Sequence, residues 1–115
     1  MKLIDTRKTD WTLLRMGFAL LASFAVLTVC SKNSFLYPMN DWVDVNCFFT
    51  VGRGITHGLV PYRDLYDQKG PLLYFVYALA ALISEHGFFG VFVIEALLFS
   101  LFLYLGGRIA ELLSK

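Results

Sequence analysis

Charge and cysteine are both scarce in this sequence. Of its 115 residues 17% are charged, and ten basic side chains against nine acidic ones give a net charge of +1. The basic residues are scattered and lack interleaved base-stacking aromatic residues, so no nucleic acid is expected as a partner. The two cysteines, Cys30 and Cys47, form no CxxC pair and have no histidine at ligand spacing. We therefore expect neither a metal site nor a disulfide framework.

Apolar side chains are, by contrast, abundant. They make up 57% of the chain, against about 45–50% in soluble domains, and Phe alone occurs 11 times. A soluble core of this size could not bury so much apolar surface, so part of it must face lipid. The sequence therefore predicts an integral membrane protein of the all-α class. We expect about three transmembrane helices, with one or two short amphipathic surface helices in the first outer loop.

The first apolar run predicts transmembrane helix 1 over residues 11–30, after a polar and basic segment over residues 1–10. Its 20 residues match the length that a helix needs to cross a bilayer. Arg15 lies within one turn of the polar start and can reach the lipid headgroups. The alternative is a cleaved lipoprotein signal that ends before Cys30. Val29 disfavours it, because such a site has a small residue there.

Two further apolar runs lie closer to the C-terminus. Residues 71–84 predict transmembrane helix 2. This run extends only about 21 Å, against a hydrocarbon core of about 30 Å, and flanking polar residues at the headgroups would complete the crossing. A tight turn over residues 85–87 leads to transmembrane helix 3 over residues 88–107, and residues 108–115 form a polar C-terminus.

The distribution of basic residues predicts the orientation of the chain. The first 15 residues hold four basic side chains, whereas the loop over residues 31–70 holds four that are balanced by four Asp. Segments with excess positive charge stay on the cytoplasmic side of a membrane. We therefore expect a multi-pass protein with a cytoplasmic N-terminus and an extracytoplasmic loop over residues 31–70.

An amphipathic helix is expected within this loop. Asn40 or Asp41 can cap its start, and Gly58 can end it in the left-handed conformation. An amphipathic helix beside a membrane span is expected to lie along the bilayer surface. The residues on its apolar face are Val45, Phe48, Gly52 and Ile55, with Phe49 at the edge.

Two carboxylates near the start of this helix are candidates for catalysis. Asp41 and Asp44 are three positions apart, which places them on neighbouring positions of one helical face. A carboxylate at the outer membrane surface can act as a general base toward a hydroxyl. Alternatively, Asp41 as the cap and Asp44 at the third helical position would mimic a capping box. Both interpretations stay open on spacing alone.

Four other charged residues are candidate ligand-binding or intramembrane groups. Arg53, Arg63 and Lys69 could bind the phosphate of an amphipathic lipid. They could equally anchor the chain at the interface, with local Arg–Asp pairs that contribute little. Glu95 lies in the middle of the last apolar run. An ionisable residue at that depth marks a function or, in its protonated form, meets a helix partner.

Four short motifs of the loop follow one another in a definite order. They are Asp44-x3-Phe48, Gly52-Arg53, Gly58-x2-Pro61-Tyr62-Arg63-Asp64 and Lys69-Gly70-Pro71-Leu72. This order resembles the first loop of bacterial dolichyl-phosphate-mannose-protein mannosyltransferase-like enzymes, which belong to the GT-C superfamily of multi-spanning glycosyltransferases. The resemblance extends from about Trp11 to Tyr104.

The resemblance implies a role for one carboxylate in particular. Asp44 matches the acidic position that would deprotonate an acceptor hydroxyl while the sugar leaves its polyprenyl phosphate with inversion, and Asp41 is the nearby alternative. The chain departs from the family twice. It has Asp44-Val45 where the family often has Asp-Glu, and Lys69-Gly70-Pro71 where the family has Lys-Pro-Pro. The resemblance assigns no cofactor.

Enzymes of this kind have many more helices and usually a further domain. We therefore expect the N-terminal fragment of a membrane glycosyltransferase from a bacterial cytoplasmic (inner) membrane, inactive alone. Its expected partners are the lipid bilayer, a polyprenyl-phosphate sugar, and the remaining helices of a longer enzyme or a partner membrane protein. The alternative is a small membrane interaction protein whose polar loop is structural and docks a larger partner.

Overall fold

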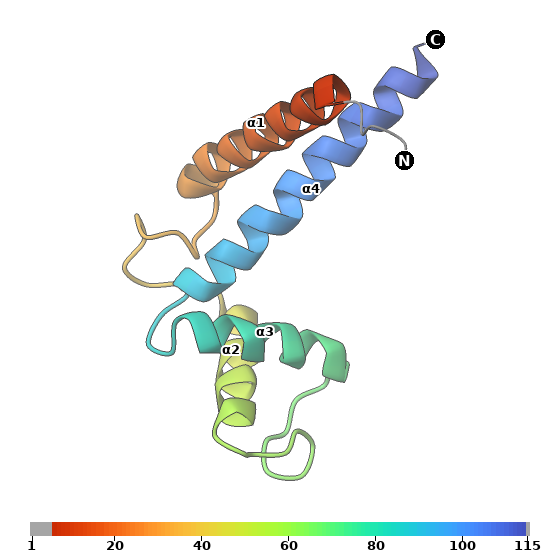
Figure 1. The fold of residues 1–115 in the computed structure, drawn as a ribbon. Helices are drawn as coiled ribbons and strands as arrows, with labels where there is room; N and C mark the ends of the chain where they lie inside the picture. Colours follow the sequence, from red (N-terminus) through yellow and green to blue (C-terminus); the bar gives the residue numbers. More distant parts are fainter. Residues whose placement is uncertain (1–5, 115) are drawn as a thin grey trace. The chain divides into compact units, whose positions relative to one another are not determined.

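The computed structural model describes residues 6–114, with side chains from Trp11 onward; of the predicted segment 1–10, residues 1–5 lie outside the described part. The described residues form α-helices and no β-strand, which confirms the all-α prediction for that part of the chain (Figure 1). The chain divides into two compact units, Met1–Leu27 with Glu95–Lys115, and Thr28–Ile94. The helices are α1 (Thr6–Cys30), α2 (Val43–Thr56), α3 (Pro71–Ile83) and α4 (Phe89–Leu113).

Two stretches of the described helices are long and apolar enough to cross a membrane. They are Trp11–Cys30 within α1, which coincides with the first predicted span, and Phe89–Leu113, which continues past the predicted end at residue 107. The helix α3 has 13 residues and is therefore about 20 Å long. It falls short of a hydrocarbon core of about 30 Å. Length alone therefore favours two crossings over the three expected from the sequence.

In the first unit, α1 and α4 meet through small residues. Ala19 and Ser23 lie one turn apart on α1 and are buried, and Ala96 is buried on α4. The Ser23 hydroxyl donates a hydrogen bond of 2.7 Å to the carbonyl oxygen of Ala96. Small residues let two helix backbones approach closely, and helix pairs within membranes are commonly packed in this way.

The two helices of this unit run antiparallel. Arg15, near the start of α1, pairs with Glu111, near the end of α4, at 2.8 Å between guanidinium nitrogen and carboxylate oxygen. Further along α1, Ser23 contacts Ala96, which lies in the first part of α4. Residues that follow one another on α1 therefore face residues in reverse order on α4.

In the second unit, α2 packs on α3 at a very close crossing. A Cβ atom added to Gly52 would lie 2.5 Å from the carbonyl carbon of Tyr77, so only glycine permits this approach. A small apolar core surrounds the crossing, formed by Phe49, Ala80, Ala81 and Val91. The apolar face predicted for α2 is confirmed in part, because Val45, Phe49 and Gly52 are buried, whereas Phe48 and Ile55 are only partly buried. It is α3 that covers this face, whereas the sequence placed it against a bilayer surface.

The connection between α3 and α4 depends on a second glycine. The two helices are joined by residues 84–88, and a Cβ atom on Gly90 would come within 1.9 Å of the carbonyl oxygen of Ala80. The tight turn predicted over residues 85–87 lies within this connection. The end of α3 and the first turn of α4 therefore touch backbone to backbone.

The two ends of α2 differ in how well the sequence predicts them. Gly58 has φ +85°, and the N–H groups of Gly58 and Leu59 donate to the carbonyls of Ile55 and Gly54 at 3.0 Å each. This is a Schellman motif, which confirms the predicted left-handed end. At the start, Trp42 occupies the cap position, and no described side chain makes a cap hydrogen bond there. The prediction that Asn40 or Asp41 caps α2 is therefore wrong.

We expect Ser23→Leu to separate α1 from α4, because a large side chain must enter a site where Ser23 is 0% exposed. Overpacking of this kind costs about 1–3 kcal/mol, whereas Ser23→Ala removes only the hydrogen bond, worth roughly 0.6 kcal/mol between membrane helices. The free energy of unfolding in mixed micelles measures both. Ala25→Leu, at an exposed position of α1, is the neutral control. Equal stability of Ser23→Leu and Ser23→Ala would contradict the close crossing.

Gly52→Ala should destabilise the second unit for the same steric reason, again by about 1–3 kcal/mol. Gly17→Ala is the matched control, because an added Cβ atom there meets nothing within 4 Å. Thermal unfolding followed by circular dichroism compares the two variants. If Gly52→Ala were as stable as Gly17→Ala, the α2–α3 crossing would be looser than described.

Candidate functional site

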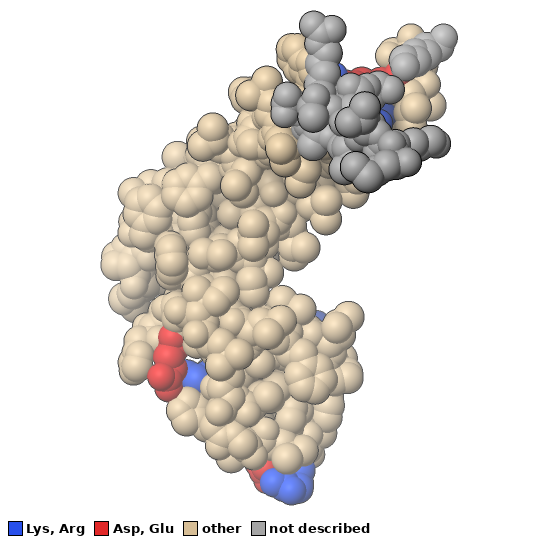
Figure 2. Space-filling model, in the orientation of Figure 1, with Lys and Arg blue, Asp and Glu red and all other residues tan. Residues whose placement is uncertain are grey.

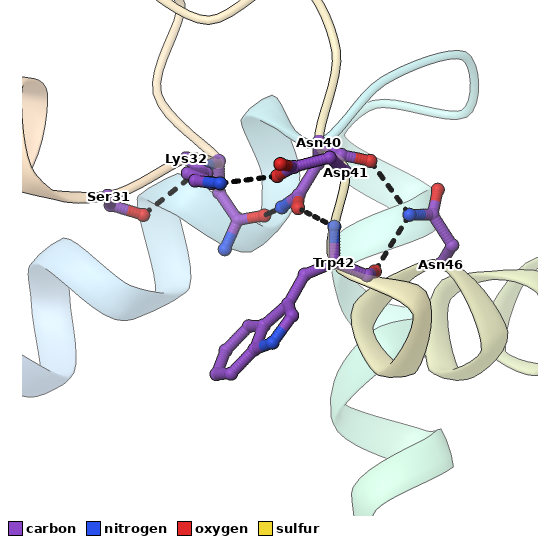
Figure 3. A network of polar contacts seen from close by, with 7 residues as sticks. Ser31, Lys32, Asn40, Asp41, Trp42 and Asn46 are labelled. Carbon is purple, nitrogen blue, oxygen red and sulfur yellow. Dashed lines mark hydrogen bonds and ion pairs between the residues drawn. The ribbon is translucent and has the colours of Figure 1, made fainter.

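A network of polar side chains fixes the loop that leads from α1 into α2 (Figure 3). Asn40 and Asn33 are buried, and the Asn40 amide nitrogen donates to the Asn33 side-chain oxygen at 2.6 Å. The Asn40 side-chain oxygen accepts from the backbone N–H of Trp42 at 2.9 Å. Asn46 donates to the carbonyls of Asn40 and Trp42 at 2.8 Å each. These bonds hold the first turn of α2 against the loop that precedes it.

The two candidate carboxylates have different surroundings. Asp41 lies in the loop and accepts a short charge-assisted hydrogen bond from the ammonium group of Lys32. This bond, followed by a backbone hydrogen bond and the charge of Lys32, lowers the pKa of Asp41. Asp44 lies in the first turn of α2, exposed to solvent. Its side chain makes no hydrogen bond or ion pair with any residue that the structure describes.

The capping-box alternative for these carboxylates does not match the geometry. Asp44 is the second residue of α2. The backbone N–H of the cap residue Trp42 donates to the side-chain oxygen of Asn40 and not to that of Asp44. Asp41 is occupied by Lys32. The structural role left for Asp44 is electrostatic. Its negative charge interacts with the positive end of the helix, which contributes about 0.3–1 kcal/mol to stability.

Arg63 is engaged in a local ion pair. Its guanidinium group donates two hydrogen bonds to the carboxylate of the next residue, Asp64, at 2.9 and 2.7 Å. Asp64 also accepts from the backbone N–H of Val60 at 2.8 Å. The hydrogen bonds from Arg63 and Val60 lower the pKa of Asp64 to about 2. Arg63 thus takes part in the local Arg–Asp pairing that was the alternative to phosphate binding.

The other two basic candidates, Arg53 and Lys69, differ from Arg63. Neither Arg53 nor Lys69 pairs its side chain with another residue in the described part of the chain. Arg53 follows Asp44 by nine positions on α2, which places the two on opposite sides of the helix, about 13 Å apart along its axis. The structure therefore does not bring Arg53 and Asp44 together.

Lys69 is held through its backbone, immediately before α3. Its carbonyl oxygen accepts from the Tyr62 hydroxyl, and its N–H donates to the Tyr74 hydroxyl at 2.8 Å. Tyr62 has φ +66°, a left-handed conformation that costs energy in a residue with a side chain. One carboxylate oxygen of Asp67 is buried without a hydrogen-bond partner in the described part of the chain. The turn before α3 is therefore strained at Tyr62, and hydrogen bonds with two tyrosine hydroxyls hold its backbone in place.

Aromatic contacts connect the surroundings of Asp44 to this turn. Phe48 lies one helical turn after Asp44 on the same side of α2. Its ring contacts those of Tyr74 and Tyr77 on α3, with centroids 6.5 and 5.7 Å apart. Tyr74 in turn packs edge-on against Tyr62, at 5.9 Å. Asp44 therefore stands at the edge of an aromatic wall shared by α2, α3 and the turn before α3.

Sequence reasoning missed several residues that build this region. Lys32, which distinguishes Asp41 from Asp44, Asn33 in the loop and Asn46 on α2 carried no recognisable spacing signal, whereas Asn40 was expected only as a cap. Glu95 lies in the first unit, partly buried next to Ala96. Among the described residues, no group of three or more His, Cys, Asp or Glu side chains is arranged to hold a metal ion.

Comparisons of the chain with protein-family models, with curated proteins and with solved structures return no match.

The Asp64 pKa of about 2 predicts an acid-sensitive turn. Because the folded-state pKa lies below the unfolded value of 3.8, the ionised carboxylate stabilises the turn above about pH 4. That contribution is lost as the pH falls through the folded pKa. Carboxyl-carbon NMR of the labelled protein in micelles should give a titration midpoint for Asp64 well below 3.8, and Arg63→Gln should move it upward. A midpoint at or above 3.8 in the unchanged chain would contradict the ion pair.

Proposed function

We propose that this chain is the membrane-embedded N-terminal part of an outer-face glycosyltransferase of the GT-C type, with Asp44 as its general base. In the proposed reaction, Asp44 takes the proton of an acceptor hydroxyl while the sugar leaves its polyprenyl phosphate with inversion. The observation that carries the choice of base is the difference between the two carboxylates. Asp41 is bound to Lys32, and Asp44 is exposed and bound to no described side chain.

The chemistry of a general base favours the unpaired carboxylate. A base must approach the hydroxyl to hydrogen-bond distance in its ionised form, and its proton affinity must suit the transfer. The hydrogen bond from Lys32 occupies an oxygen of Asp41 and lowers its pKa, which makes Asp41 a weaker base than an aspartate without this partner. Asp44 is exposed, so a hydroxyl can approach it without breaking an ion pair with a described residue.

The free cations restrict where the phosphate of the donor lipid would bind. Arg63 already donates two hydrogen bonds to Asp64, and we assign it to holding the turn. Arg53 lies on the side of α2 opposite Asp44. Lys69 is therefore the phosphate ligand that we propose, because its backbone is fixed by Tyr62 and Tyr74 and its ammonium group pairs with no described side chain.

The antiparallel arrangement of α1 and α4 supports a topology with two crossings. If both helices span the bilayer, their distal ends emerge on the same side, so the chain between them, with α2 and α3, stays on the other. Three crossings would make α1 and α4 parallel. Because the N-terminus is basic, we place both chain ends in the cytoplasm of a bacterial cell and residues 31–88 outside its cytoplasmic membrane.

On the face drawn in Figure 2, the described surface is almost free of Lys, Arg, Asp and Glu. Several large apolar side chains of α1 and α4 are more than half exposed, among them Phe18, Leu21, Phe102 and Leu112. Such a surface is stable in contact with lipid tails or with other apolar helices. It supports embedding of the chain in a membrane, as the proposal requires.

The two-crossing topology predicts opposite accessibility for α2 and the C-terminus. In a Cys30→Ser background, the exposed Cys47 on α2 should react with a membrane-impermeant maleimide added to intact cells. A cysteine placed at Ser114 in a chain without Cys30 and Cys47 should react only after lysis. Labelling of position 114 in intact cells would mean three crossings. Labelling of Cys47 only after lysis would reverse the orientation.

The role of Asp44 is tested by Asp44→Asn, because Asn keeps the size of the side chain but cannot accept the proton. Sugar transfer from a polyprenyl-phosphate donor, measured in native membranes, should fall about 10²–10⁴-fold. Asp41→Asn should cause a smaller loss.

Two controls accompany this experiment. Equal amounts of variant and unchanged chain in the membrane fraction exclude a folding defect, and the purified chain alone should show no transfer. Transfer requires a water-excluded site around the donor phosphate and the acceptor, and in the proposal the remaining helices of a longer enzyme complete that site. Near-normal transfer by Asp44→Asn at matched expression would remove Asp44 as the base.

A further inference from the structure

We propose that the groove between α1 and α4 binds one anionic phospholipid. Its acyl chain would lie along the apolar wall of the groove, and its phosphate would contact Arg15 and Arg108. The inference rests on the membrane embedding proposed above but goes beyond the transferase activity. It assigns a ligand to a part of the fold that carries none of the residues proposed for catalysis.

The groove is formed wholly within the first unit and is large enough for a lipid tail. Its volume is about 690 Å³. Away from the helix ends, its walls consist of apolar side chains from both helices, among them Leu14, Phe18 and Leu103. The buried contact of Ser23 with Ala96 lies further along the two helices, toward the opposite end of α1. A lipid tail along these walls would fill the space beside the helix contact, which would otherwise be an empty cavity.

Charged residues are confined to one end of the groove. Arg15 and Glu111 are paired there at 2.8 Å, and Arg108 lies 3.9 Å from the same carboxylate. The three side chains are about half exposed and carry a net charge of +1. Glu111 holds Arg15 closely and Arg108 only loosely, so the Arg108 guanidinium can donate its remaining N–H groups to a phosphate.

The position of this cluster suits a lipid headgroup. Trp11 and Tyr104 also line the groove, and these residue types favour the boundary between hydrocarbon and headgroups. With both chain ends in the cytoplasm, the cluster faces the cytoplasmic leaflet, where anionic lipids attract basic residues. Along the groove, the apolar wall would face the acyl chain, the aromatic residues would lie at the interface, and the cationic end would meet the phosphate. This is the order of these parts in a phospholipid.

Trp11 can report the occupancy of the groove. In a Trp42→Phe chain reconstituted in vesicles, its fluorescence is quenched by brominated phosphatidylglycerol or by brominated phosphatidylcholine, each at the same mole fraction. We expect the local ratio of anionic to zwitterionic lipid, derived from quenching, to exceed the bulk ratio about fivefold. The attraction of one Arg side chain to an anionic membrane surface corresponds to about a fivefold preference for anionic lipid. Arg108→Gln should abolish the preference and Glu111→Gln should increase it, whereas Arg53→Gln should leave it unchanged.

Each other outcome overturns the proposal. Equal quenching by the two lipids, or a preference that Arg108→Gln does not change, means that the groove does not select an anionic lipid, while membrane embedding stands. If millimolar inorganic phosphate removes the preference, the site binds free phosphate. Quenching by neither lipid means that a second helix or another protein fills the groove. Retention of the chain in carbonate-washed vesicles then separates this result from a failure of embedding.

Discussion

The crossing of α1 and α4 is the contact on which the arrangement of the two candidate membrane spans depends. Ala19, Ser23 and Ala96 are small enough for the two backbones to approach, and the Ser23 hydroxyl satisfies one acceptor at the contact. Between membrane helices there is no hydrophobic force to favour association, so close packing and hydrogen bonds must supply it. The Arg15–Glu111 pair sets the direction of the helices relative to each other.

A different constraint organises the segment between these helices. Gly52 lets α2 touch the backbone of α3, and Gly90 brings the start of α4 against the end of α3. Because α3 packs on the buried side of α2, α2 requires no bilayer to cover that side. The other side of α3 stays apolar and exposed, with Leu72, Leu79 and Leu82 each more than half exposed. The aromatic wall and the polar loop are thereby held in place, and the charged side chains of the segment are divided into paired and unpaired groups. Among the residues that the structure describes, Asp44 and Lys69 fall into the unpaired group, on which the proposed chemistry depends.

The sequence predicts those features that depend on neighbouring residues. The first apolar helix and the left-handed end at Gly58 follow from local composition, and the apolar face of α2 follows from its periodicity. It does not predict that α3 covers this face, because the contact requires that a glycine at position 52 meet the backbone at position 77. The pairing of Lys32 with Asp41 and of Arg15 with Glu111 likewise depends on how the chain folds back. Arg63 is an intermediate case, since its partner Asp64 is adjacent and only the geometry distinguishes a local pair from a phosphate ligand.

The most direct test of the account is the direction of α4 relative to α1 in a membrane. Two double-cysteine chains without Cys30 and Cys47 would be treated in vesicles with a short bismaleimide, one with Arg15→Cys and Glu111→Cys, the other with Arg15→Cys and Glu95→Cys. The antiparallel pair predicts an intramolecular cross-link in the first chain and none in the second. A cross-link in the second chain and none in the first would mean parallel helices. It would contradict the two-crossing topology, together with the placement of the Asp44 loop that follows from it.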